Sequence, residues 1–166
     1  MRRIILNLGI VALLLGCNPD DTCTKTVAES ELSAVDQTRL AADIITIDSY
    51  LAANSIDAIE EPHGVRYVIT KQGDGPTPCL ESTIRVIYSG RLFSGTVFDS
   101  STTPVSFRLN QLIIGWKLVL PITQAGSKVT LYIPSGYGYG PQGGGGGTIP
   151  SNANLIFDIE LVEIFD

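Results

Sequence analysis

The sequence has few of the residues that build metal sites and disulfide-rich domains. Its 166 residues include three cysteines, one histidine and one tryptophan. No two cysteines stand in a CxxC pair, and His63 is the only histidine, so a structural zinc site of the usual ligands is excluded. Three cysteines are also too few for a small domain that depends on several disulfides. The length fits one ordinary domain, or one domain with a sizeable extension.

Basic residues are scarce as well. The chain has 11 Lys and Arg against 17 Asp and Glu, a formal charge of −6, which argues against a nucleic-acid partner because phosphate backbones are bound by basic patches. The charge is uneven: residues 17–61 hold ten acids against Lys25 and Arg39, whereas residues 62–166 hold seven residues of each sign. The acidity therefore belongs to an N-terminal extension, residues 31–61, and its tether.

The chain has no hydrophobic run of the about 20 residues that a membrane-spanning helix needs. Its N-terminal run, from Ile4 to Leu15, follows two arginines, an arrangement typical of a secretory signal. The segment Leu14–Cys17 resembles the bacterial lipobox, whose cysteine is lipidated after cleavage. An ordinary secretory signal or a short anchor is the alternative.

The lipobox resemblance implies how the N-terminal region is processed. Residues 1–16 would be a signal peptide, Cys17 the lipidated residue and residues 17–30 a polar tether. The protein would then be extracytoplasmic and anchored to a bacterial membrane, on its periplasmic or surface side.

Residues 31–53 have the periodicity of an amphipathic helix. The apolar positions recur at intervals of mostly three or four residues and are Leu32, Val35, Leu40, Ile44, Ile47 and Leu51. Asp36, Asp43 and Asp48 are interpreted as lying mostly off this stripe, on a solvated face. The stripe needs a partner, either the rest of this chain or a second copy. We expect docking on the same chain, and a monomer.

From Val65 the apolar period changes to two, which is typical of strands. The predicted strands are Val65–Lys71, Ser82–Phe93, Val105–Leu109, Ser127–Ile133 and Leu155–Ile164, with a short one at Val97–Phe98. Asn110 is expected to cap a short helix near Leu112–Leu120 that Pro121 ends. Gly136–Gly147, with eight glycines, is predicted to be a long flexible loop. The pattern indicates an α+β fold: an antiparallel, curved sheet of five to six strands around one short helix.

Several segments of residues 62–166, in order, carry a family resemblance. They are Val86–Gly90, Gly95–Ser101, Asn110–Trp116, Gly126–Lys128, Ile133–Pro134, Tyr137–Gly140, Ile149–Pro150 and Leu155–Leu161. Together they resemble the FKBP family of peptidyl-prolyl isomerases. The resemblance implies a half-wrapped antiparallel sheet and an aromatic pocket that accepts the proline ring of a peptide.

The same resemblance assigns the residues of this pocket. Trp116 would form its floor, and Leu112 and Ile113 would line one rim, with the Ile113 amide available to a ligand carbonyl. Asp99 and Tyr139 would be the polar groups at the mouth. The walls would be Tyr88, Phe98, Val105, Phe107, Ile149 and Phe157. Without the resemblance, these aromatic residues would be read as ordinary core.

Residues of these types suit the isomerisation of an X-Pro bond. The barrier of about 20 kcal/mol comes from amide resonance, which the twisted transition state loses. Because the twisted carbonyl is less dipolar than the planar one, an apolar pocket disfavours the planar form relative to the transition state. Neither a nucleophile nor a metal or cofactor is needed. The expected substrates are proline-containing segments of exported proteins, and the alternative is a non-catalytic peptide-binding or chaperone module that uses the same pocket.

Three departures from the family pattern lead us to expect weaker or less selective catalysis. The segment after Asp99 lacks the arginine that often pairs with the family's aspartate. Val105 stands where an aromatic residue is common, and Gly143–Gly147 would carry a large ordering cost on binding. If Cys17 is lipidated, Cys23 and Cys79 remain as a possible disulfide pair; two unrelated thiols are the alternative.

Overall fold

The computed structural model describes residues 23–165. Its helices are α1 (Glu29–Ser33), α2 (Gln37–Ala53) and α3 (Ile114–Val119), and its strands are β1 (Ile59–Glu60), β2 (Arg66–Lys71), β3 (Thr83–Leu92), β4 (Val97–Arg108), β5 (Lys128–Ile133) and β6 (Leu155–Phe165). Short 3-10 turns are η1 (Leu109–Gln111), η2 (Leu120–Ile122), η3 (Ser135–Tyr137), η4 (Gly140–Gln142) and η5 (Gly145–Gly147).

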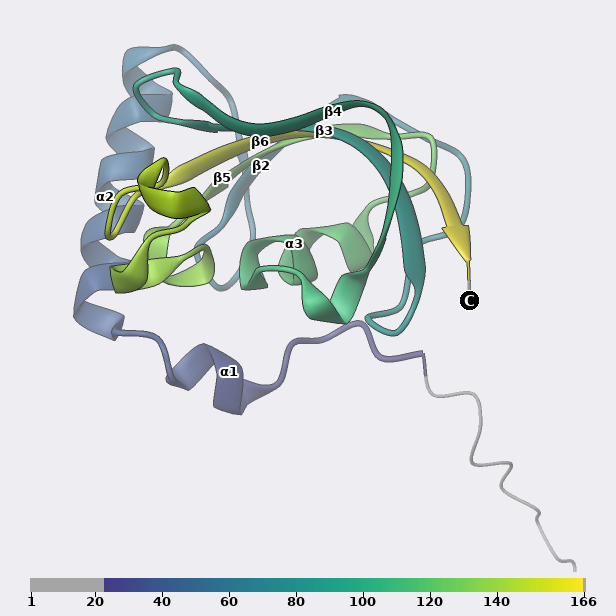
Figure 1. Ribbon diagram of the computed structural model, residues 1–166, viewed down its shortest axis with the longest axis horizontal. Helices are drawn as coiled ribbons and strands as arrows, with labels where there is room; N and C mark the ends of the chain where they lie inside the picture. The colour runs from purple at the N-terminus through teal and green to yellow at the C-terminus, as the bar shows by residue number, and fades with distance from the viewer. Residues whose placement is uncertain (1–22, 166) are drawn as a thin grey trace, which may run out of the picture.

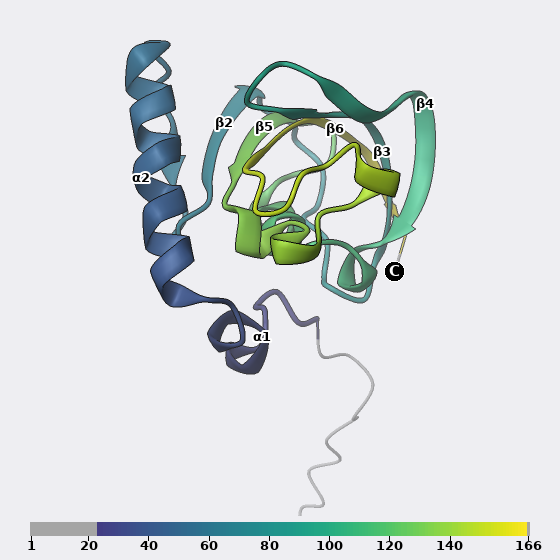
Figure 2. The same cartoon turned by 60° about the vertical axis from the view of Figure 1, so that its left-hand side comes forward.

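The strands form one antiparallel sheet in the order β1-β2-β5-β6-β3-β4. The sheet arches over α3 (Figure 1), and α2 stands beside it next to β2 (Figure 2). The predicted fold class is therefore confirmed, including the helix N-terminal to the sheet. None of the helices in residues 23–165 is long and apolar enough to span a membrane.

Alternate residues of the central strands supply hydrophobic cores on opposite faces of the sheet, as the period of two requires. Leu131 and Ile133 of β5 point into the cluster shared with α3, whereas Tyr132 between them belongs to the cluster shared with α2. In that second cluster Ile47 and Leu51 of α2 are buried. The apolar stripe of the extension thus docks on the sheet of its own chain, as predicted.

The helical extension differs from its prediction in two respects. The expected continuous helix is broken between α1 and α2, because the Asp36 carboxylate accepts hydrogen bonds from the Thr38 and Arg39 amides and starts a new helix there. Asp43 was expected on the solvated face, but it is 1% exposed. It lies three residues after Leu40, on the buried side of α2.

Three predictions for the region after β3 also need correction. The two strands expected on either side of residue 100 are one strand, β4, with a register shift against β3. Asn110 does not cap α3: it lies in η1, and the N-cap position belongs to Ile113, which makes no side-chain cap hydrogen bond. The segment predicted as a flexible loop contains η3, η4 and η5, and Gly144 and Ile149 form a β-bridge across it.

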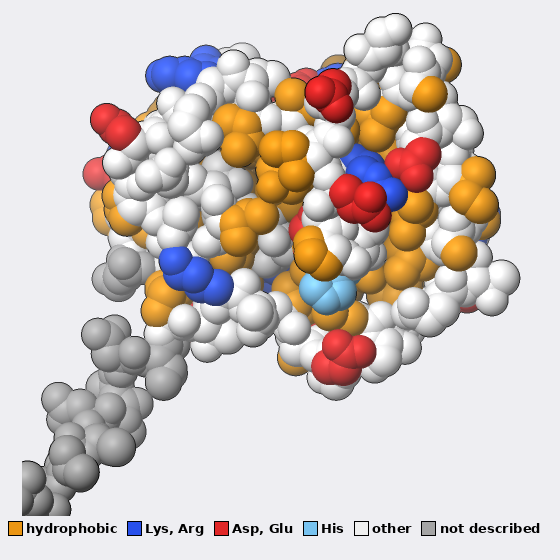
Figure 3. Space-filling view, turned by 180° about the vertical axis from the view of Figure 1, so that it is seen from behind, with side chains coloured by type: hydrophobic (Ala, Val, Ile, Leu, Met, Phe, Trp, Pro, Cys, Tyr) orange, Lys and Arg blue, Asp and Glu red, His pale blue; other side chains and the backbone are white. Residues whose placement is uncertain are grey.

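Acidic side chains of the extension form ion pairs with basic residues of the sheet region. Arg66 of β2 lies 2.9 Å from Asp48 and 3.3 Å from Glu60, and Lys117 of α3 pairs with Glu31 of α1. On the face seen in Figure 3, one basic group lies directly among acidic side chains, with hydrophobic side chains around them. Part of the extension's negative charge is therefore neutralised within the fold.

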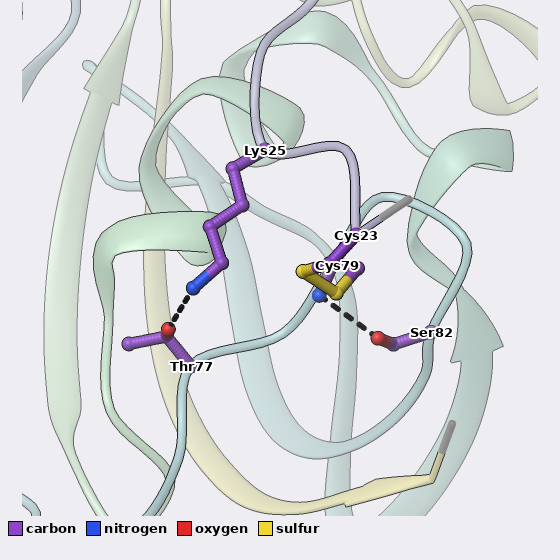
Figure 4. The surroundings of a disulfide bond; sticks show 5 residues. All are labelled: Cys23, Lys25, Thr77, Cys79 and Ser82. Carbon is purple, nitrogen blue, oxygen red and sulfur yellow. Dashed lines mark hydrogen bonds between the residues drawn. A yellow bond between two sulfur atoms is a disulfide. The ribbon is translucent and has the colours of Figure 1, made fainter. Parts of the chain in front are cut away.

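The segment just before α1 is also joined covalently to the segment before β3. Cys23 and Cys79 form a disulfide, with their Cα atoms 5.1 Å apart (Figure 4). Beside it, the Leu80 amide donates to the Thr24 carbonyl at 2.7 Å, and Lys25 donates to the Thr77 hydroxyl. The disulfide that was one of two alternatives in the sequence is thus present in this structure.

Candidate active site

A cavity of about 170 Å³ lies between the concave face of the sheet and α3. It is lined by Tyr88, Asp99, Phe107, Leu112, Ile113, Trp116, Tyr139 and Phe157. All eight belong to the residues proposed from the sequence, and they come from β3, β4, the start of α3, the loop after β5, and β6. The fold therefore brings together residues that are up to 69 positions apart in the chain.

Trp116 on α3 packs against the aromatic side chains of the sheet. Its ring centroid lies 5.2 Å from that of Phe157 and 5.8 Å from that of Tyr88, and both contacts are edge-to-face. The helix can approach the sheet because residue 115 is glycine: a Cβ there would be 2.5 Å from Ile133. The Trp116 Nε1 atom is buried and has no hydrogen-bond partner within residues 23–165.

Tyr88 and Asp99 form the polar edge of the cavity. The Tyr88 hydroxyl donates a hydrogen bond of 2.7 Å to Asp99 Oδ2. Burial, together with this bond and the carboxylate charge, raises the pKa of Tyr88 to about 12. Burial and the Asp99 charge also raise the pKa of Tyr139. Both tyrosines therefore stay neutral at physiological pH, with hydroxyl groups able to donate hydrogen bonds.

The remaining proposed wall residues, Phe98, Val105 and Ile149, lie next to the cavity and not on its lining. Phe98 makes edge contacts with Phe157 and Tyr139, at centroid distances of 5.5 and 6.4 Å. Val105 on β4 pairs with Val86 on β3, and Ile149 is buried in the core. Phe98 therefore supports two lining residues, whereas Val105 and Ile149 belong to the surrounding core.

The loop that carries Tyr139 is held at both ends by α2, which the sequence reasoning missed. Asp43 accepts hydrogen bonds from the backbone amide of Ser135, at 3.0 Å, and from its hydroxyl. Arg39 pairs with Asp43 at 2.8 Å and donates to the Asn152 carbonyl at 3.0 Å. The spacing of Asp43 from Leu40 was the signal that could have placed it on the buried face. We call Arg39, Asp43, Ser135 and Asn152 the loop clamp.

A family model described as FKBP-type peptidyl-prolyl cis-trans isomerase matches residues 75–162, a range that includes all eight cavity residues. The chain belongs to this family. Solved structures of the family share the antiparallel sheet of this fold. Residues of α1 and α2 lie outside the matched range.

Known relatives and solved structures agree with this assignment. The chain is 46% identical over 104 residues to a probable FKBP-type peptidyl-prolyl cis-trans isomerase of Neisseria meningitidis, covering 61% of this chain and 38% of the relative. It is 37% identical to the outer membrane protein MIP of Legionella longbeachae, covering 70% of this chain and 52% of the relative. A peptidyl-prolyl cis-trans isomerase structure from Pseudomonas syringae superposes with a TM-score of 0.67 at 33% identity, over 76% of this chain and 96% of that one. The chain thus spans about half or less of these two curated relatives.

Proposed function

We propose that the protein is a peptidyl-prolyl cis-trans isomerase that acts on X-Pro bonds of exported proteins. The observation that carries the proposal is the aromatic cavity of about 170 Å³, lined by residues that the family resemblance assigns to the proline pocket. No step needs a cofactor: the cavity holds the prolyl ring by burial, and this fixes the axis about which the amide rotates.

The lining favours the twisted transition state over the planar amide. Phe107, Trp116 and Phe157 present apolar surface to the ring, so the more dipolar planar amide is poorly solvated there. Ile113 is the N-cap residue of α3, where a backbone amide has no acceptor within the helix and can bind a substrate carbonyl. Tyr139 and the Tyr88–Asp99 pair orient the peptide at the mouth.

A protease-coupled assay with a proline tetrapeptide tests the proposal. Phe107→Ala removes a half-buried ring from the cavity, and we expect kcat/KM to fall at least about tenfold. The matched control is Phe93→Ala, because Phe93 is also half-buried but packs against Tyr50 on the opposite face of the sheet. We expect the control to keep its activity within about twofold of the wild type.

A wild-type protein with no rate above background would overturn the enzyme proposal. Peptide binding seen by NMR, without faster cis-trans exchange, would then favour the binding or chaperone module. Macrolide binding alone does not separate the two functions, since both need the cavity.

We further propose that the protein is a monomer held at a bacterial membrane by a lipid on Cys17. Cys17 and the signal peptide proposed at residues 1–16 lie outside the described residues. Support comes from the Cys23–Cys79 disulfide, since disulfides persist mainly outside the cytoplasm. Incorporation of labelled palmitate tests the anchor, and label retained by Cys17→Ser would contradict it. Sedimentation tests the monomer.

A further inference from the structure

A groove of about 510 Å³ lies between the turn that links α1 to α2 and the loop after β5. Val35 and Arg39 line it on the helical side, and Gly136, Gln142 and Asn152 on the loop side. Tyr139 lines both this groove and the smaller cavity of about 170 Å³. The groove therefore adjoins the proposed active site at Tyr139 and lies on the side toward the helical extension.

The groove is formed before any ligand binds, because the loop clamp fixes its two walls. Asp43 is buried and holds Ser135, at the start of the loop, while Arg39 holds Asn152 at its end. The packing at its base is tight: a Cβ on Gly136 would be 2.3 Å from Val35 Cγ1. A preformed groove keeps low the ordering cost that a ligand would otherwise have to offset.

The groove offers its occupant little unbalanced charge. The Arg39 guanidinium is paired with Asp43, so the one charge of the lining without an opposite partner is the Asp36 carboxylate, which accepts two amide hydrogen bonds at the start of α2. Gly140, which also lines the groove, has no heavy atom within 4 Å of where its Cβ would be, so a ligand backbone can approach the loop closely. These features suit an uncharged, partly apolar stretch of extended polypeptide.

The sizes of the two spaces point to the same occupant. Ligand sites usually measure about 300–1,000 Å³. The aromatic cavity, at about 170 Å³, is large enough for little more than one side chain, whereas the groove, at about 510 Å³, is within the usual range. We propose that the groove is a second substrate subsite, which binds the segment of the client polypeptide adjacent to the X-Pro bond held in the cavity. This inference rests on the proposed isomerase function.

The test compares a short and a long substrate with groove-filling variants. Ala34→Trp and Gln142→Trp place a large ring in the groove from its two walls, and Ala52→Trp, on an exposed position near the other end of α2, is the matched control. The substrates are a proline tetrapeptide and an unfolded protein whose refolding is limited by prolyl isomerisation. For the protein substrate we expect KM to rise roughly fivefold in both groove variants with kcat retained, because only binding energy is lost.

For the tetrapeptide, which does not reach the groove, we expect all three variants to match the wild type within about twofold. Groove variants that match the control on both substrates, or that lose both activities equally, overturn the subsite. A wild-type protein inactive on both substrates overturns the proposed function instead. In that case, fluorescence anisotropy measures the binding of a labelled, permanently unfolded proline-containing polypeptide. A Kd for Gln142→Trp equal to that of the wild type would overturn the subsite.

Discussion

The hydrogen bond between Tyr88 and Asp99 gives an otherwise apolar cavity a fixed polar edge. The hydroxyl donates to the carboxylate at 2.7 Å, so the Tyr88 ring is held in one orientation against Phe107 and Trp116. The missing arginine noted in the sequence does not leave Asp99 without a partner: a tyrosine of the neighbouring strand takes that place. A neutral donor in place of a cation keeps net negative charge at the mouth, which adds to burial in raising the pKa of both Tyr88 and Tyr139.

The raised pKa of Tyr88 predicts a loss of stability at alkaline pH. A tyrosine in the unfolded chain ionises near pH 10, whereas Tyr88 in the folded protein ionises near pH 12. Between these values the unfolded chain releases a proton that the folded protein keeps. The stabilisation is therefore complete below pH 10 and is lost as the pH rises toward 12.

Urea unfolding at pH 7, 9 and 11 measures this effect in the wild type and in Tyr88→Phe. We expect the variant to lose less stability than the wild type between pH 9 and 11, because it has no proton to release at this position. The difference between the two proteins at pH 7 gives the cost of the missing hydrogen bond and serves as the baseline. An equal alkaline loss in both proteins would contradict the prediction.

At the residue scale, the cavity was predictable because its side chains occur in ordered segments with a recognisable pattern. Trp116, Tyr88 and Phe157 are identified by that pattern and not by composition. The resemblance also assigned Phe98 and Val105 to the walls, but neither lines the cavity in this structure. A shift between β3 and β4 pairs Val86 with Val105 but Tyr88 with Ser101, so β4 has extra residues there, and which side chain reaches the cavity is not readable from alternation alone.

At the scale of elements, α2 and the loop after β5 behave as one unit. The Asp43 carboxylate is 1% exposed and is compensated by Arg39 and by the Ser135 amide and hydroxyl. Asn154 also accepts from that amide, at 3.0 Å. A buried carboxylate is tolerated only with such partners, so α2 can dock only where the loop supplies them.

Asp43→Ala removes the centre of the loop clamp, and we expect the free energy of unfolding to fall by about 2 kcal/mol. The cost is moderate because the Arg39 side chain is 43% exposed and can regain water, and Ser135 keeps one acceptor. Urea unfolding measures it. Asp57→Ala is the matched control, since it removes the same charge from an exposed position beyond α2 and should change stability by less than about 0.5 kcal/mol. Equal midpoints for the two variants would rule out the clamp as a source of stability.

Element types were predictable from the sequence, but their ends and joins were not. The change of apolar period at Val65 separates the helical part from the sheet, and the stripe at Leu40, Ile47 and Leu51 identifies the buried face of α2. The break at Asp36 depends on a local competition between capping and continuing the helix, which periodicity does not register. The turns within the glycine-rich loop depend on tertiary contacts such as the Gly144–Ile149 bridge.

At the scale of the whole molecule, the extension is held against the family domain at separate places. The Cys23–Cys79 disulfide joins the segment just before α1 to the segment before β3, the Glu31–Lys117 ion pair joins α1 to α3, and α2 packs on the convex face of the sheet. The acidic N-terminal part therefore covers the domain and does not project from it as a free stalk. The sequence could not show this, because neither the distance between the cysteines nor the partner of the stripe is encoded locally.

The disulfide spans 56 positions of the chain, so its removal should destabilise the whole fold. Closing a loop of this length lowers the entropy of the unfolded chain by an amount worth about 4 kcal/mol at 25 °C, and removal of native disulfides commonly costs about 2–5 kcal/mol. We expect the double variant Cys23→Ser, Cys79→Ser to lose stability within that range in urea unfolding. Isomerase activity at 25 °C should persist, because none of the cavity residues lies between Cys23 and Cys79.

Reduction of the wild type provides the control for this last prediction. Dithiothreitol should lower the wild-type unfolding midpoint to that of the double variant and leave the variant unchanged, since both then lack the same covalent link. The reduced wild type keeps both sulfur atoms, whereas the double variant lacks them. A difference in stability between these two proteins would therefore measure the packing of the sulfur atoms, separately from the covalent link. A reduced wild type as stable as the oxidised protein would show that the ion pairs and the α2 core alone hold the extension, and that the disulfide adds nothing to the cohesion of the molecule.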